Sequence, residues 1–214
     1  SLGSGKAFFA HAVREEIKYG ADFIKLMATG GFFTPNDNPM QQQINDEEME
    51  AVITTAHEWG KTVTAHVYRS DHIRKLLKYG IDGLEHCSLI DEETAQMVAE
   101  QNVYVVPTFC PYEDAVHYDP VLIQTKQPEY REKLEYYKDM LQKGREVIKN
   151  SNMKLGYGTD QVATHMCYES GYEYKAWMES GMGGFRALHA ATQVNGEILR
   201  LDDKIGSIEP GKYA

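Results

Sequence analysis

Cysteine is scarce in this chain of 214 residues, and long apolar runs are missing. The three cysteines, Cys87, Cys110 and Cys167, are scattered without Cys-x-x-Cys spacing, which argues against a disulfide framework and for reduced thiols. No apolar run approaches the roughly 20 residues of a membrane-spanning helix, and the polar opening from Ser1 to Gly5 does not resemble a signal peptide. We therefore expect a cytoplasmic protein without a membrane partner.

The chain also lacks an excess of basic residues. Its 22 lysines and arginines stand against 32 aspartates and glutamates, which gives a formal net charge of -10. Nucleic acids select basic surfaces, so this balance argues against a nucleic-acid partner. The rest of the composition, 42% hydrophobic and 25% charged, is that of a globular protein with one sizeable core.

Helical patterns alternate with short apolar runs along the chain. The clearest helix is predicted over residues 46–59, where Asn45 and Glu48 can form a capping box. Further helices are predicted over residues 8–19, 71–79, 92–101 and 129–149, near 187–191 and near 196–199. The apolar runs that we interpret as strands cover residues 23–27, 62–66, 81–86, 103–106 and 155–160. This alternation is typical of βαβ units and a parallel sheet.

The number of strands is too small for a complete barrel of this kind. A closed (β/α)8 barrel has eight strands and about 250 residues. The chain begins almost directly in a helix, and residues 206–214 have the pattern of a turn into another strand. We therefore expect an α/β fold, a partial (β/α)8 TIM-like barrel truncated at both ends, in residues 1–205.

Four side chains with versatile chemistry close four of the apolar runs: Lys25, His66, His86 and Asp160. Strand ends on one face of a parallel barrel converge on the active site, so we expect these side chains to meet. Neutral imidazole is a good ligand for zinc, iron or nickel; a hydrogen-bonded structural histidine is the alternative for either histidine alone. Glu85 should point away from His86 by the two-residue period of a strand, as a buried structural carboxylate.

The lysine and the aspartate allow several roles. A carboxylate at Asp160 can bind a metal and accept a proton, although an aspartate that begins a loop can also cap a turn. The amine of Lys25 interrupts an apolar run, where it could form a Schiff base or take up carbon dioxide as a carbamate that bridges metals. The alternative for Lys25 is a head group that reaches solvent.

Other polar residues near the strand ends are candidates for contact with a substrate. Tyr68 and Tyr112 each follow a strand end on the active face, and His165 lies in the loop that follows Asp160. Residues 110–127 contain two prolines and no clear period, so we expect a long loop there, a candidate lid over the strand ends.

Taken together, the motifs resemble the amidohydrolase superfamily, and within it imidazolonepropionase-like amidohydrolases, which include Xaa-Pro dipeptidases and related carboxypeptidases. Their order and spacing match over nearly the whole chain. The motifs that carry the resemblance are residues 20–25 with 28–31, 64–66, 84–86, 106–108, 158–160, 187–188, 190–192 and 206–212.

The resemblance implies a metal-dependent hydrolase of amide bonds in a dipeptide, an N-acyl amino acid or a cyclic amide. Lys25 would be a carboxylated lysine at the end of the fourth barrel strand, bridging two metals, and His66 and His86 would bind the second metal. Asp160, on the eighth strand, would bind the first metal and act as general base for a metal-activated hydroxide. Tyr112 would grip a substrate carboxylate. The implied cofactors are one or two divalent ions, with zinc preferred, and carbon dioxide as the carbamate.

The chain also departs from the family pattern, and alternatives stay open. It has no His-x-His pair, and Tyr68 stands where a second histidine is common. Residues 206–214 would begin the return into a β-sandwich domain that is absent. A lyase that uses Lys25 in a Schiff base and a non-catalytic fragment are the other functions considered. A homo-oligomer is also open, because the sequence does not fix the number of subunits.

Overall fold

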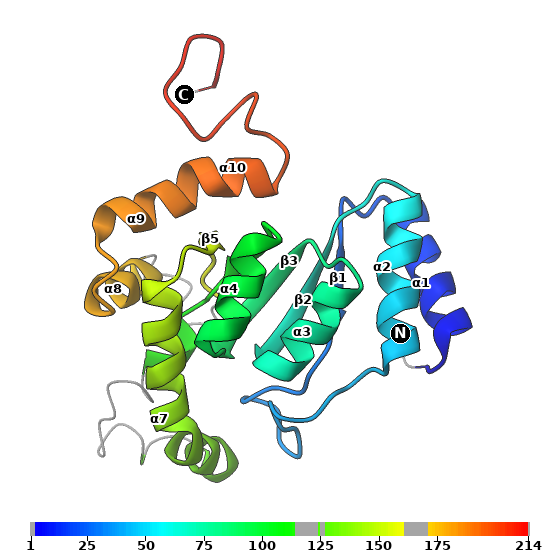
Figure 1. Cartoon of the computed structure of the whole chain (residues 1–214). Helices are drawn as coiled ribbons and strands as arrows, with labels where there is room; N and C mark the ends of the chain where they lie inside the picture. The colour runs from blue at the N-terminus through cyan, green and yellow to red at the C-terminus, as the bar shows by residue number, and fades with distance from the viewer. Residues whose placement is uncertain (1–2, 114–123, 125–126, 161–170, 214) are drawn as a thin grey trace.

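One parallel five-stranded sheet, in the order β1-β2-β3-β4-β5, organises the chain (Figure 1). The computed structural model describes residues 3–113, 124, 127–160 and 171–213. The strands are β1 (Ile24–Met27), β2 (Val63–Arg69), β3 (Gly83–Leu89), β4 (Tyr104–Val106) and β5 (Lys154–Leu155). Sequential order and parallel pairing confirm the predicted α/β class.

Helices connect the strands and cover one face of the sheet (Figure 1). They are α1 (Lys6–Lys18), α2 (Asp46–Glu58), α3 (Ser70–Lys78), α4 (Glu92–Glu100), α7 (Pro128–Asn150), α8 (Tyr172–Glu179), α9 (Gly184–His189) and α10 (Asn195–Ile198), with a 3-10 turn η1 (Cys110–Tyr112) and a π-helical turn η3 (Ala190–Val194). The predicted capping box is present: the Asn45 side chain accepts from the Glu48 N–H at 3.0 Å, and the Glu48 carboxylate accepts from the Asn45 N–H at 2.8 Å.

The last helices differ from the sequence prediction. The π-helical turn η3 joins α9 to α10, so one continuous helical run replaces the two separate helices expected there. None of the helices in the described ranges has the length and apolarity that crossing a bilayer requires.

Two strands run further than the sequence predicts. β2 continues to Arg69 and β3 to Leu89, and these two residues are themselves paired. His66 and His86 therefore lie inside their strands and not at the last position. The extension comes from pairing with a neighbouring strand, which an apolar run read in isolation does not report.

The strand predicted over residues 155–160 is shorter than expected. Beyond Leu155, the side chain of Asn195 occupies the place of a neighbouring strand: it accepts from the Tyr157 N–H at 2.9 Å and donates to the Tyr157 carbonyl at 2.8 Å. A Cβ on Gly156 would lie 2.6 Å from Ile198 Cδ1, so the glycine lets α10 come this close. The side-chain amide takes over the backbone groups that a ladder would otherwise pair.

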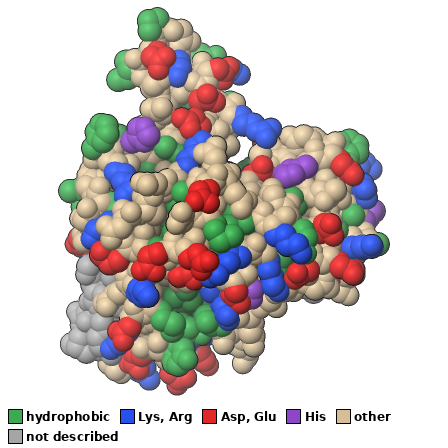
Figure 2. All heavy atoms as spheres, in the orientation of Figure 1, with side chains coloured by type: hydrophobic (Ala, Val, Ile, Leu, Met, Phe, Trp, Pro, Cys, Tyr) green, Lys and Arg blue, Asp and Glu red, His purple; other side chains and the backbone are tan. Residues whose placement is uncertain are grey.

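The two faces of the sheet differ in cover. On β1, Ile24 and Leu26 are buried toward the helices, whereas Lys25 and Met27 are exposed on the other face. A second, mostly aromatic cluster lies at the ends of the strands and packs on α7; its members are Phe32, Tyr68, Tyr112, Leu134, Tyr137 and Leu141. On the outer surface, acidic and basic side chains are interspersed over the helices (Figure 2). The face with Lys25 is therefore the one where polar groups can meet a ligand.

Helix α7 approaches β3 closely at Gly144. A Cβ on this glycine would overlap the backbone carbonyl of Ser88, the second residue after His86. A backbone oxygen in a paired strand has little room to shift, so only a residue without a side chain fits here.

We therefore expect Gly144→Ala to lower the free energy of unfolding by about 1–3 kcal/mol, because overpacking outweighs the roughly 1 kcal/mol that alanine contributes to a helix. Urea unfolding measures the change. Lys143→Ala, at the exposed neighbouring position, is the matched control and should stay within about 0.5 kcal/mol of the parent. Equal stabilities for the two variants would contradict the close packing.

Candidate functional site

Two histidines meet on the open face of the sheet. The parallel register places Met27, His66 and Glu85 in one row across β1, β2 and β3. His66 Nδ1 lies 2.9 Å from His86 Nε2, and both rings are buried. The structure thus brings together the two side chains that the sequence predicted as ligands of one ion.

Strand β3 achieves this by leaving the ordinary conformation. His86 and Cys87 have φ of 69° and 53°, in the left-handed region that non-glycine residues rarely adopt. The register already places Glu85 on the inner face with His66, and its carboxylate accepts from the Thr64 hydroxyl at 3.1 Å. The alternation of side chains breaks at His86, whose ring therefore joins the same face, so the prediction that Glu85 points away from the site is wrong.

The outer nitrogens of both rings have partners. His66 Nε2 lies 3.3 Å from the Gly30 carbonyl oxygen, and His86 Nδ1 lies 2.6 Å from Thr108 Oγ1. Ligand histidines in metal sites hold their second ring nitrogen in this way, on a carbonyl or another acceptor. The contact between Thr108 and His86 was missed at the sequence level, although Thr108 belongs to one of the motifs that carry the family resemblance.

This arrangement fits a divalent ion. Burial lowers the pKa of His66 and, further, that of His86, so both rings are neutral at pH 7. When each ring donates its outer N–H, to Gly30 and to Thr108, the two inner nitrogens are both lone-pair acceptors and repel each other. A cation held by these two nitrogens would remove the repulsion, so the pair of neutral donors fits a divalent ion.

Lys25 and Asp160 act on this pair through their charge. Burial has the largest effect on the pKa of His66 and lowers it, and the hydrogen bond to Gly30 raises it. The charge of Lys25 lowers the same pKa further, and the charge of Asp160 raises it. Both charged side chains are exposed. Within the described residues, no three His, Cys, Asp or Glu side chains are already gathered as a metal-binding group. The structure therefore places all four predicted residues around one region but brings only the two histidines into contact.

The predicted substrate-binding residues divide into two cases. Tyr68 and Tyr112 are almost fully buried, at 1% and 2% exposure, and their hydroxyl oxygens lie 2.7 Å apart. The Tyr68 ring stacks on His86 with 5.1 Å between centroids. Burial raises the pKa of both tyrosines, so the hydroxyls are neutral. His165 and most of the predicted lid lie outside the described residues.

Comparison with known proteins identifies relatives of this chain. The profile described as Amidohydrolase family matches residues 6–214. A prolidase complexed with N-methylphosphonate-L-proline superposes with a TM-score of 0.86 and 30% identity, over 99% of this chain and 51% of that chain. A Xaa-Pro dipeptidase with bound methionine in the active site gives 0.85 and 30%, over 99% and 52%.

A fungal enzyme is a third relative. Ochratoxinase of Aspergillus niger is 37% identical over 107 residues, which are 50% of this chain and 22% of that protein. Its crystal structure superposes with a TM-score of 0.81 at 28% identity, over 99% of this chain and 48% of that chain. The chain thus spans about half the length of these solved relatives, and the superpositions confirm the predicted partial barrel.

The tyrosine pair gives a test of the site's packing. We expect Tyr68→Phe and Tyr112→Phe each to lower the free energy of unfolding by about 1–3 kcal/mol, because each leaves one buried hydroxyl without its partner. The double variant should lose less than the sum, since it removes both hydroxyls and leaves none unpaired. A double-mutant cycle by urea unfolding measures the coupling, and additive losses would refute the hydrogen bond.

Proposed function

Because the chain belongs to the amidohydrolase family, we propose that it forms part of a metal-dependent hydrolase of amide bonds. The observation that carries the proposal is the pair of facing nitrogens, His66 Nδ1 and His86 Nε2, whose rings are held from behind by Gly30 and Thr108. Such a pair is what a divalent ion with imidazole ligands requires. Zinc is the ion we propose.

Lys25 is the proposed source of a further ligand. Its positive charge lowers the pKa of both histidines, and an ammonium cannot bind a cation. As a carbamate, formed with carbon dioxide, the Lys25 side chain would carry a negative charge. It would also offer two oxygen atoms as metal ligands to an ion held by the two histidines. The modification would thus turn an unfavourable charge into a ligand.

Asp160 is the proposed general base. When bound, a divalent ion polarises an amide carbonyl and lowers the pKa of a water molecule. Asp160 would accept a proton from the attacking water as the new C–O bond forms, and would deliver it to the nitrogen as the C–N bond breaks. The exposed position of Asp160 leaves its carboxylate free to reach water and substrate.

The proposed substrate is a dipeptide or an N-acyl amino acid. Similarity to a prolidase and to a Xaa-Pro dipeptidase supports the dipeptide. Tyr68, Tyr112 and His165 stay proposed substrate contacts. Residues 206–214 are proposed as the start of a return into a β-sandwich domain, and the cytoplasm as the location.

Metal content tests the ligand pair directly. We expect His66→Ala to weaken binding of zinc by at least about 10–100-fold, since removing a ligand costs no less than removing a residue that orients one. Elemental analysis after dialysis at a fixed zinc concentration measures the loss. His57→Ala is the matched control, because His57 is half exposed and pairs with Asp82 away from the site. Equal zinc in all three proteins would exclude His66 as a ligand.

Turnover tests the general base. We expect Asp160→Asn to lower kcat for Xaa-Pro dipeptides or N-acyl amino acids by roughly 10²–10⁴-fold, because the amide cannot accept the proton. Asp202→Asn, at another exposed position, should leave the rate unchanged. Circular dichroism checks that both variants keep the fold. Full activity of Asp160→Asn would remove Asp160 from this role.

A further inference from the structure

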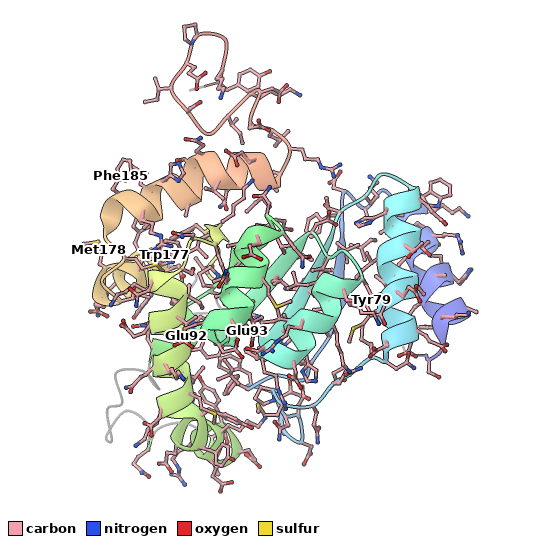
Figure 3. All side chains as sticks on the ribbon, viewed as in Figure 1. Tyr79, Glu92, Glu93, Trp177, Met178 and Phe185 are labelled. Atoms are coloured by element: carbon pink, nitrogen blue, oxygen red, sulfur yellow. The ribbon has the colours of Figure 1, made fainter. Side chains whose placement is uncertain are left out.

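Helix α8 carries a carboxylate that the proposed reaction does not use. Glu173 is 0% exposed, yet its oxygens accept three hydrogen bonds. The donors are the Phe109 N–H at 3.0 Å, the Cys110 N–H at 2.7 Å and the Trp177 indole N–H at 2.8 Å. Trp177 lies on α8, one turn after Glu173 (Figure 3). Burial raises the pKa of Glu173 to about 7, while the three donors favour the charged form. A buried carboxylate with this many donors has a specific structural role.

The two amides converge because of the backbone at the end of β4. Thr108 is in the left-handed region with φ of 46°, and Phe109 follows in the right-handed helical region with φ of -68° and ψ of -33°. Successive residues of opposite hand turn their N–H groups to one side and form a concave anion site. The Glu173 carboxylate occupies that site.

The left-handed conformation of Thr108 is unfavourable by itself. A β-branched residue at positive φ is strained, and such strain persists only where surrounding contacts hold it. The bonds from the next two amides to Glu173 supply those contacts, from a helix 63–64 residues further along the chain. In this strained conformation, the Thr108 hydroxyl oxygen lies 2.6 Å from His86 Nδ1.

We propose that Glu173 is a positioning residue for the metal site. It holds the turn of residues 108–110, the turn fixes the Thr108 hydroxyl, and the hydroxyl sets the ring of His86 with Nε2 toward His66. The expected effect on metal affinity rests on the proposed function, because it requires that the two histidines bind a metal. Its geometric part, from Glu173 through Thr108 to His86, stands on contacts within this chain.

The turn keeps other anchors when Glu173 changes. The Arg145 guanidinium lies 4.7 Å from the centre of the Phe109 ring, and the Phe109 and Trp177 rings lie 5.9 Å apart. We therefore expect a substitution at Glu173 to loosen the backbone of the turn without removing it from the core.

Glu173→Gln is the main test. The glutamine has the same shape, but it accepts from one amide and presents its NH₂ group to the other. We expect the dissociation constant for zinc or cobalt(II) to rise by roughly 10–100-fold, the range for residues that orient a ligand. Competition with a chelator measures it, and the d–d absorption of bound cobalt reports a changed geometry. A folded Glu173→Gln protein with the parent's affinity would overturn the proposal.

A double variant separates positioning from general stability. If Glu173 acts through the Thr108 hydroxyl, then Thr108→Ala should weaken metal binding similarly, and Glu173→Gln combined with Thr108→Ala should bind no more weakly than Thr108→Ala alone. Losses that multiply would show two independent effects and overturn the proposal. Glu179→Gln is the matched control: it makes the same change at an exposed carboxylate of α8 that pairs with Lys175, so affinity should stay near that of the parent.

Metal-free protein supplies a readout that does not depend on the proposed function. In NMR spectra, Glu173→Gln should move the ring ¹⁵N resonances of His86 toward those in Thr108→Ala and leave those of His57 in place. Unmoved His86 resonances would overturn the inference about Glu173, whether or not the parent binds metal. A parent protein that binds no metal would instead refute the proposed function. If Glu173→Gln does not fold, Glu173→Asp, whose carboxylate is one methylene short, takes its place with the same expected and overturning results.

Discussion

The register of the parallel sheet is the constraint on which the site depends. It sets Met27 beside His66 and His66 beside Glu85, so residues far apart in the chain share one row. In a parallel sheet, a slip of one residue would turn every side chain of a strand to the other face. The helices fix the register from behind, because the main core lies between them and the sheet.

Strained backbone near the site refines what the register provides. His86, Thr108 and Asp160 all have positive φ; His86 lies inside β3, Thr108 lies two residues after β4, and Asp160 lies five residues after β5. Strain of this kind concentrates at functional sites, where surrounding contacts hold it. At His86 it brings a side chain onto the inner face, and at Thr108 it aims a hydroxyl.

The sequence predicts the parts of this protein that local chemistry determines. Helical periodicity and the Asn45 capping box located α2, and the two histidines were identified from matching runs. The role of Thr108 and the position of His86 on the same face as Glu85 were not predictable, because both follow from left-handed residues that no local motif announces. The length of β2 was not predictable either, since pairing with β3 extends it. The features that the sequence did not predict depend on tertiary contacts. The features that it predicted depend on neighbouring residues within one helix or strand.

The site has one dry side and one open side. Tyr68 stacks on His86 within an aromatic cluster that excludes water, whereas Lys25 and Asp160 lie exposed across from it. Charge interactions are strong next to the buried aromatic cluster, because little water is present there to screen them. A proton can exchange with solvent only on the exposed side. Burial on the closed side lowers the pKa of both rings and keeps them neutral, the state in which imidazole binds a cation.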